Sequence, residues 1–238
     1  MQLFHINADN IRIKWNIIEI FSIQDLLSQL RKVLRIKKWD KICVQYSGKE
    51  WTIRHELSIQ DWTDKDLTGE IISSQTFSFP KKIVSMLIAM PNKREKTELI
   101  TQKLTEIWVQ NIYFWVSEHS IIRQWSEKKA ERLDKISHEA AEQSRWTQVP
   151  EIKFLKSEKE LKDFVDWKNV IIANMNWLPY WELSKIESNG ICGVIWPEWW
   201  FSPKDLELFN DAKIIDLWDN VLRMETASIV LWWILKNM

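Results

Sequence analysis

The stretch VIWPEWWFSP, residues 194–203, connects an apolar run to the start of a helix. The run ends at Ile195 and predicts the end of a buried strand, whereas Ser202 followed by Pro203 predicts an N-cap with proline at the first helical position. Such a sharp connection normally uses glycine, because only glycine enters positive φ freely and lets another backbone or a ligand come close. Three indole side chains are a poor choice for this loop, so they need a physical explanation.

The composition of the chain offers one explanation. It contains 17 Trp and only 4 Gly among 238 residues, whereas average usage of about 7% glycine would give roughly 17. Trp39 lies in a turn before a β-like run, Trp108 lies where a helix stops, and Trp218 follows a short apolar run, all positions that favour glycine. We hypothesise that the source reads UGA as glycine and that the gene was translated with UGA as tryptophan.

The alternative is a protein that is truly rich in tryptophan. The recoding hypothesis is weaker for four tryptophans that fit a core or a surface equally well: Trp115, Trp125, Trp232 and Trp233.

The overall composition limits the class of protein. The 33 basic and 33 acidic residues cancel, so no global positive charge indicates nucleic acid, although a local patch is enough. Cys43 and Cys192 are far apart and predict buried, reduced thiols of a cytoplasmic protein. The first ten residues lack the basic-then-apolar pattern of a signal peptide, and no apolar run approaches the roughly 20 residues of a membrane span. We therefore expect no membrane partner.

The first part of the chain predicts a small β-barrel with one helix, residues 1–73. Segments with alternating apolar residues predict strands at 12–20, 41–59 and 69–75. Apolar residues at helical spacing predict a helix at 22–36, with Ser22 as its N-cap. The segment 76–82 around Pro80 reads as a linker.

From Ile83 the pattern changes to strands that alternate with helices, which predicts a parallel α/β sheet. The expected strands are 82–90, 109–116, 168–175, 191–196 and 212–217. The expected helices are 93–107, 126–144, 202–212 and 225–238.

Two motifs of this half, IWPEWWFSPKDLEL at 195–208 and LWDNVLRMETA at 217–227, carry a resemblance to a known family. Together with ELITQKLTEIWV at 98–109 and KKAERLDKISHEAAEQS at 128–144, the chain resembles the bacterial 16S ribosomal RNA uridine-N3 methyltransferases of the SPOUT superfamily. That family has glycine where this chain has tryptophan at 39, 108, 196, 199, 200 and 218.

The resemblance implies a fold, a reaction and partners. It implies a PUA-like barrel over 1–73 and a SPOUT domain with a deep trefoil knot over 79–238. It implies methyl transfer from S-adenosylmethionine to N3 of a specific uridine of 16S rRNA in the small ribosomal subunit, by a cytoplasmic homodimer. The alternatives are a catalytically inactive knotted RNA-binding protein, if the tryptophans are real, and a SPOUT methyltransferase that acts on another RNA site.

The resemblance also assigns a cofactor pocket to backbone-rich loops at strand ends. The residues it implies are Ala173, Ile195, Trp196, Pro197, Glu198, Trp199, Trp200, Leu217, Trp218, Val221 and Leu222.

Two charged residues near these loops are candidates for chemistry. Glu198 is placed to bind a cofactor hydroxyl, to assist removal of the N3 proton, or to cap the following helix. Arg223 opens the last helix and is placed to hold a uracil oxygen or a phosphate, and its structural alternative is a salt bridge to Glu225.

Basic residues on both halves are candidates for RNA contact, with a solvated helix face as the alternative. They are Arg31, Lys32, Arg35 and Lys38 on the barrel, and Lys93 and Arg94 after the first strand of the α/β half, with Lys96, Arg123 and Arg145 as further candidates. His5, His55 and His138 lack carboxylate or cysteine partners at metal-binding spacing, so no metal site is expected.

Overall fold

The computed structural model describes residues 2–48, 50–166, 168–183, 190–196, 202–209, 211–218 and 220–238. The chain forms two compact units, Met1–Phe79 with Arg145–Gln148, and Pro80–Ser144 with Val149–Met238. Among the described residues, no helix combines the length and the apolar character that crossing a membrane requires.

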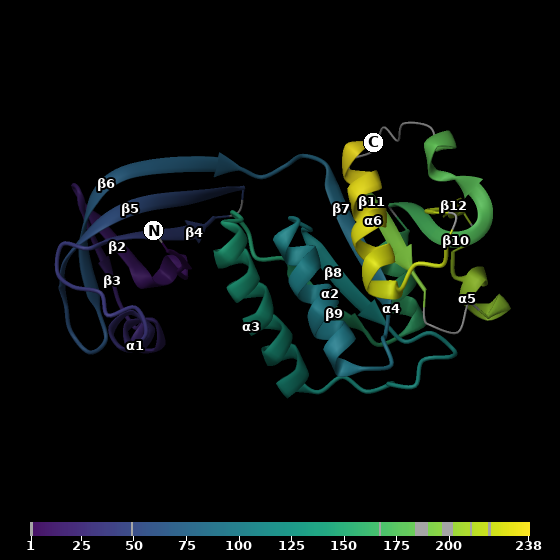
Figure 1. Cartoon of the computed structure of the whole chain (residues 1–238), viewed down its shortest axis with the longest axis horizontal. Coiled ribbons are helices and arrows are strands. Elements are labelled where there is room, and N and C mark those ends of the chain that lie inside the picture. The colour runs from purple at the N-terminus through teal and green to yellow at the C-terminus, as the bar shows by residue number, and fades with distance from the viewer. Residues whose placement is uncertain are drawn as a thin grey trace. The chain divides into compact units, whose positions relative to one another are not determined.

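The N-terminal unit is a six-stranded sheet with one α-helix (Figure 1). The strand order is β1-β4-β5-β6-β3-β2, in which only the β1–β4 pair is parallel. Ile18, Leu27, Val44 and Leu57 belong to its apolar core. The elements are β1 (Leu3–His5), the 3-10 turn η1 (Ala8–Asn10), β2 (Ile11–Lys14), β3 (Ile17–Ile20), α1 (Gln24–Lys32), β4 (Lys41–Ser47), β5 (Trp51–Trp62) and β6 (Leu67–Ser78).

Two details of this unit differ from the sequence expectation. Ser22 is not an N-cap: it has φ 61, and α1 begins at Gln24 and ends at Lys32. Arg35, with φ 52, lies beyond the helix in the part expected to be helical. Strand β6 continues past residue 73 to Ser78, because its last residues pair with the start of β5, as Trp51 does with Ser78. The first three residues of the expected linker, 76–78, are therefore strand.

The C-terminal unit is a six-stranded parallel sheet with strand order β12-β10-β11-β7-β8-β9. Its strands are β7 (Ile83–Ala89), β8 (Asn111–Trp115), β9 (Glu151–Leu155), β10 (Asn169–Pro179), β11 (Gly190–Ile195) and β12 (Lys213–Asp216). Its helices are α2 (Arg94–Glu106), α3 (Glu127–Ser144), α4 (Glu158–Val165), the 3-10 turn η2 (Tyr180–Glu182), α5 (Pro203–Glu207) and α6 (Met224–Asn237). The predicted parallel α/β sheet is confirmed, with β9 and α4 as additions.

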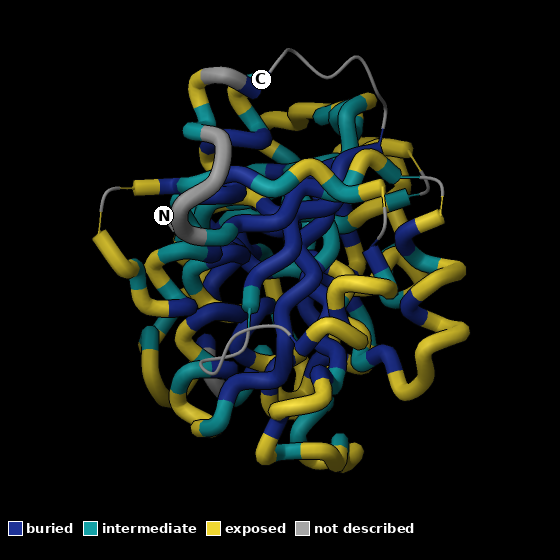
Figure 2. Tube along the Cα trace, turned by 90° about the vertical axis from the view of Figure 1, so that its right-hand side faces the viewer, coloured by how far each residue is buried: buried dark blue, intermediate teal, exposed yellow. Residues whose placement is uncertain are grey.

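Helices cover both faces of this sheet, so its strands are largely buried (Figure 2). Helices α2, α3 and α6 share one apolar cluster with alternate residues of β7, such as Met86 and Ile88. Helix α4 and Phe209, just after α5, pack on the other face with Leu87. Gly193 of β11 lets α6 come close, because a Cβ there would lie 2.9 Å from a methyl carbon of Leu231.

Three tryptophans have the left-handed backbone that favours glycine: Trp15 with φ 59, Trp39 with φ 77 and Trp108 with φ 76. A bulky residue with positive φ is a genuine outlier. None of the chain's glycines, all within the described residues, has positive φ. The backbone therefore favours glycine at positions that carry tryptophan, as the recoding hypothesis predicts for Trp39 and Trp108.

The hydrogen bonds at the end of α2 show why Trp108 must be left-handed. The Val109 N–H donates to the Leu104 carbonyl at 3.1 Å, and the Trp108 N–H donates to the Thr105 carbonyl at 3.0 Å. These two bonds form a Schellman motif, in which the residue after the helix cap is left-handed and usually glycine. The predicted glycine-favouring position at the end of this helix is confirmed.

Trp39 and Trp15 also occupy turn positions whose positive φ favours glycine. The Asp40 N–H donates to the Lys37 carbonyl at 3.1 Å, so Trp39 is the third residue of a turn, and positive φ there defines a type II turn that needs glycine. Trp15 is the first of two residues that join β2 to β3, where Lys14 pairs with Ile17. Positive φ at that first position alone belongs to a type II′ turn, again a glycine position.

Candidate functional site

A cavity of the C-terminal unit lies at the carboxyl ends of its strands. It has a volume of about 370 Å³ and lies where β11 and β12 end and where Ala173 of β10 pairs in register with Ile215. The strand order reverses beside it, because β7 pairs with β8 on one side and with β11 on the other. Parallel α/β sheets bind their ligands at such a switch point. The cavity is thus in the expected place for a binding site.

Seven of the predicted cofactor residues come together in this cavity. They are Ala173, Ile195, Trp196, Leu217, Trp218, Val221 and Leu222. The other four, Pro197, Glu198, Trp199 and Trp200, lie outside the described residues. The sequence did not single out Asn174, Asp216, Asn220, Met224 or Ala227, which also line the cavity.

Two indoles form part of the cavity wall. The Trp196 Nε1–H donates to the Ala173 carbonyl, a backbone acceptor at the edge of the cavity. Trp218 is 57% exposed, and its backbone N–H donates to Asp216 Oδ1 at 3.2 Å. Neither tryptophan has positive φ. Glycine at 196 and 218 would therefore act by making room and by freeing the Ala173 carbonyl, and the backbone does not require it there.

Arg223 occupies the N-cap position of α6 and lines the cavity. Its side chain is exposed and makes no hydrogen bond or ion pair within the described part of the chain. The salt bridge to Glu225 that the sequence left open is not formed, and Glu225 Oε2 is buried without a hydrogen-bond partner among the described residues. Arg223 can therefore direct its charge toward a ligand in the cavity.

The first turn of α2 holds three cations, of which only one lines the cavity. That residue is Lys96, which is half-buried. Lys93 is exposed at the N-cap position, and the Arg94 Nε–H donates to Glu98 Oε1 at 2.6 Å. Burial works to raise the pKa of the Glu98 carboxyl, but hydrogen bonds from Arg132 and Arg94 outweigh it and lower the pKa. Arg94 thus pairs with Glu98, and Lys96 is the one of the three that lines the candidate site.

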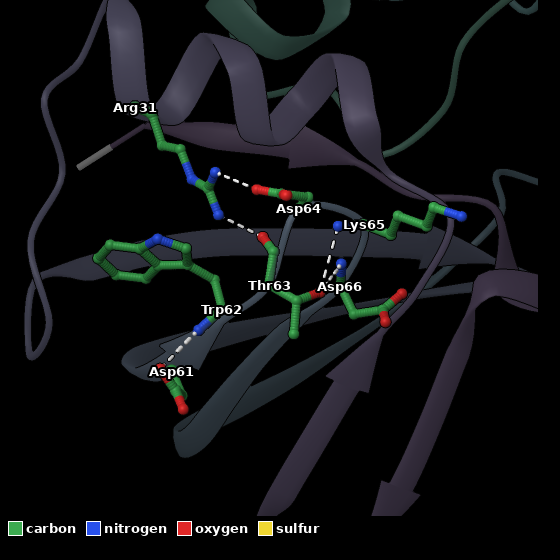
Figure 3. Close-up of polar contacts among 7 residues, drawn as sticks. All are labelled: Arg31, Asp61, Trp62, Thr63, Asp64, Lys65 and Asp66. Atoms are coloured by element: carbon green, nitrogen blue, oxygen red, sulfur yellow. Dashed lines mark hydrogen bonds and ion pairs between the residues drawn. The ribbon is translucent and has the colours of Figure 1, made fainter.

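All four residues of the basic cluster in the N-terminal unit are exposed, and Arg31 has an ion pair within the unit. Arg31 donates to Asp64 Oδ1 at 2.9 Å and to the Thr63 carbonyl, which ties α1 to the turn between β5 and β6 (Figure 3). Lys32, Arg35 and Lys38 are exposed. Arg31 therefore also contributes to the structure of the unit, and Lys32, Arg35 and Lys38 lie with it on the exposed basic surface.

The two further arginine candidates also have contacts. The Arg123 guanidinium donates to the Glu118 carbonyl. The segment Arg145–Gln148 lies along the N-terminal sheet, where the Arg145 carbonyl accepts from Arg54 at 2.8 Å and the Thr147 carbonyl accepts from Thr52 at 2.7 Å. The backbone of this segment is thus fixed by the sheet. No group of His, Cys, Asp and Glu within the described ranges is suited to a metal ion.

Solved structures with this fold span the whole chain. One is the ribosomal RNA small subunit methyltransferase E from Neisseria gonorrhoeae, bound to S-adenosyl methionine. Its sequence is 19% identical to this chain and its TM-score is 0.81, and the match covers 100% of this chain and 97% of that one. A predicted RNA methyltransferase from Thermotoga maritima has 21% identity and a TM-score of 0.69, with 100% and 98% covered. No curated protein matches the sequence.

These likenesses confirm the expected fold class, a PUA-like N-terminal domain followed by a SPOUT α/β domain. The loops that would close the predicted knot include residues 197–201 and 219, which lie outside the described residues. The sequence profile of the RNA methyltransferase domain matches residues 79–236, which is more than half of the chain. The chain therefore belongs to the RNA methyltransferase domain family.

Proposed function

We propose that this protein methylates N3 of a uridine in 16S rRNA of the small ribosomal subunit, with S-adenosylmethionine as the methyl donor. The observation that carries the proposal is the single cavity that collects the predicted cofactor loops and Arg223. Methyl transfer to N3 needs the donor methyl, N3 and the leaving sulfur in line, so it is a positioning problem. It also needs a group that stabilises the negative charge of the deprotonated uracil.

The residues present are suited to the cofactor. A volume of about 370 Å³ is within the range of about 300–1,000 Å³ typical of small-molecule sites. Leu217, Val221 and Leu222 provide apolar wall, and the Ala173 carbonyl provides a backbone acceptor beside them. The bound cofactor would supply an activated methyl group on a sulfonium. With glycine at 196 and 218, the carbonyl and the adjoining space become available to it.

Arg223 is the residue to which we assign charge stabilisation. The negative charge on uracil increases as the N3 proton leaves, so a fixed guanidinium beside it favours the transition state over the bound ground state. The position of Arg223 at the start of α6 adds the positive end of the helix dipole. We keep Glu198 as a second candidate for cofactor binding, proton removal or helix capping.

The test uses protein with glycine at 15, 39, 108, 196, 199, 200 and 218, incubated with labelled cofactor and small subunits that lack the modification. Mass mapping should place the methyl group on N3 of one uridine. Arg223→Ala should lower turnover about a hundredfold to a thousandfold while cofactor affinity stays nearly unchanged. Lys236→Ala, at the other end of α6, is the matched control and should keep full turnover. A methyl group on a ribose oxygen or on another base would refute the proposed reaction.

The second candidate is a catalytically inactive RNA-binding protein with real tryptophans. It is favoured by the bond from the Trp196 indole to the Ala173 carbonyl, since that indole would compete with a cofactor. Calorimetry separates the two candidates. The glycine form should bind S-adenosylmethionine much more tightly than the tryptophan form, whereas equal affinity would contradict the recoding argument.

We further propose that the protein is a homodimer and that Lys32, Arg35 and Lys38 contact the RNA backbone. The logarithm of the RNA-binding constant falls linearly with the logarithm of salt concentration, and each lost phosphate contact should reduce the magnitude of that slope by about one. Replacing all three with Ala should therefore flatten the salt dependence of rRNA binding and leave cofactor affinity unchanged. Light scattering at micromolar concentration tests the dimer, and a monomer would contradict it.

A further inference from the structure

Two helix N-termini meet at one wall of the cavity. Helix α2 follows β7 and helix α6 follows β12, so in a parallel sheet both helices begin at the carboxyl edge. The two helices pack in the same apolar cluster and lie side by side (Figure 1). Each has more than three turns and carries partial positive charge at its N-terminus. This wall therefore has positive potential before any side chain is counted.

Each of these helix ends also places one cation on the cavity. Lys96 comes from the first turn of α2, and Arg223 comes from the N-cap of α6. The other described lining residues belong to the ends of β10, β11 and β12, to the segment after β12 or to α6, and Lys96 alone of the described lining residues comes from α2. It thus stands on the side where β7 ends, next to exposed Lys93. The arrangement suits an anionic ligand at this wall of the cavity.

We propose that Lys96 is a further catalytic residue, whose ammonium group donates a hydrogen bond to one carbonyl oxygen of the target uracil while Arg223 holds the other. This inference rests on the proposed function. In uracil, N3 lies between the carbonyl groups C2=O and C4=O, so the charge that remains when N3 loses its proton is shared by both oxygens. Two cations from two adjacent helix ends match that charge distribution, whereas a single arginine would stabilise one half of it.

The step balances without any further reactant. N3 releases its proton to water, and its electron pair forms a bond to the methyl carbon while the carbon–sulfur bond breaks and its pair remains on sulfur. A uracil anion and a sulfonium thereby become neutral N3-methyluracil and a neutral thioether. Lys96 and Arg223 keep their protons throughout. Their contribution is to make the uracil anion accessible near neutral pH.

The same pair of donors would select uracil over cytosine. Cytosine has an amino group in place of the C4 oxygen and has no N3 proton, so a lysine ammonium in this position would face another donor. A site built to donate to an oxygen rejects a base that lacks the oxygen, because one of its donors is then left without a partner. Specificity for uracil would thus come from α2 and α6, before any contact with neighbouring nucleotides.

The test compares Lys96→Met and Lys96→Arg in the full chain with glycine at the recoded positions. Lys103→Met, in the last turn of α2, is the matched control. We expect Lys96→Met to lower the single-turnover rate about a hundredfold, with calorimetric cofactor affinity and rRNA affinity within about threefold of the parent. The pH–rate profile should move to higher pH, because loss of one cation raises the pKa of bound uridine. Lys96→Arg should recover part of both effects.

Substrate carrying 5-fluorouridine at the target position gives a second readout. Its N3 proton is more acidic, so the anion needs less stabilisation and the rate loss in Lys96→Met should shrink. An unmoved pH profile together with at least tenfold weaker cofactor binding would overturn the proposal, because Lys96 would then hold the cofactor carboxylate. Failure of the proposed function has a different signature: the parent would modify another atom, whatever the behaviour of Lys96→Met.

Discussion

Replacing a tryptophan by glycine and, separately, by alanine tests the recoding hypothesis at individual positions. Both replacements remove the same indole, so their difference cancels the buried area that is lost. At Trp15, Trp39 and Trp108, φ is between 59 and 77, and a left-handed backbone costs an L-residue about 1–2 kcal/mol. Glycine avoids that cost but loses about 0.5–1 kcal/mol more chain entropy on folding. The glycine variant should therefore exceed the alanine variant in stability by about 0.5–1 kcal/mol at each position.

Trp232 supplies the control with the opposite sign. It is 6% exposed in the interior of α6 and has no positive φ, and glycine in a helix interior is about 1 kcal/mol less stable than alanine. The order of the two variants should thus reverse between Trp232 and the three turn positions. Urea unfolding followed by circular dichroism measures each glycine–alanine pair. The unfolding midpoints of the two variants should lie about 0.3 M apart if the free energy of unfolding falls by about 3 kcal/mol per molar urea.

Trp15 gives the cleanest case, because its side chain is 98% exposed and almost no contact is lost with it. Trp15→Gly should be more stable than the unmodified chain as well as more stable than Trp15→Ala. The codons give a parallel check: UGA is expected at 15, 39 and 108, and UGG at 232. Equal stability of the glycine and alanine variants at all three turns would refute the backbone argument.

Three other predictions concern stability and RNA binding. Burial lowers the pKa of His55 below 6.5, so the unfolded chain takes up this proton first as the pH falls. The contribution of His55 to the free energy of unfolding should therefore be full above about pH 6.5 and decrease below it. Urea midpoints at two pH values should detect this decrease, and His55→Gln should remove it. Gly193→Ala should cost about 1–3 kcal/mol in urea unfolding, because its Cβ would overlap side chains of α6. Arg31→Ala should destabilise the N-terminal unit by about 1 kcal/mol through its lost hydrogen bonds, whereas Lys32→Ala should keep that stability and reduce the salt slope of rRNA binding.

Sequence signals predicted elements well where the signal was local. Ser202 forms the predicted N-cap: its side chain accepts from the Asp205 N–H at 3.1 Å, and Asp205 accepts in return from the Ser202 N–H. Helices α3 and α6 follow their apolar periodicity closely. Ser22 is also a serine that precedes an apolar run, but it does not cap a helix. Its backbone N–H donates to Asp66, which lies in the distant β5–β6 turn. Tertiary contacts, which no local pattern contains, decided that case.

The same distinction applies to the candidate site. The strand-end loops could be found from motifs, and the structure brings seven of the predicted residues to one cavity. The sequence shows a basic turn that contains Lys93, Arg94 and Lys96. It does not show which of the three side chains lines the cavity. Which one faces the cavity depends on the rotation of α2 about its axis, which its packing against the sheet fixes. Sequence reasoning favoured Lys93 and Arg94, whereas the geometry selects Lys96.

Position in the structure supports the separation of tryptophans into two groups that the sequence suggested. Trp125 stacks on Phe154 with ring centroids 5.1 Å apart and an angle of 4° between the planes, and Trp115 is buried in the core, so both contribute as tryptophan. Trp108 has a left-handed backbone that favours glycine, and the Trp196 indole donates a hydrogen bond to a backbone carbonyl at the candidate site. One change of genetic code would explain the second group, and it predicts two effects that have no other reason to occur together. Glycine at the turns should raise stability, and glycine at the cavity should raise cofactor affinity. If the tryptophans were real, evolution would have fitted the chain around them, and both changes should do harm.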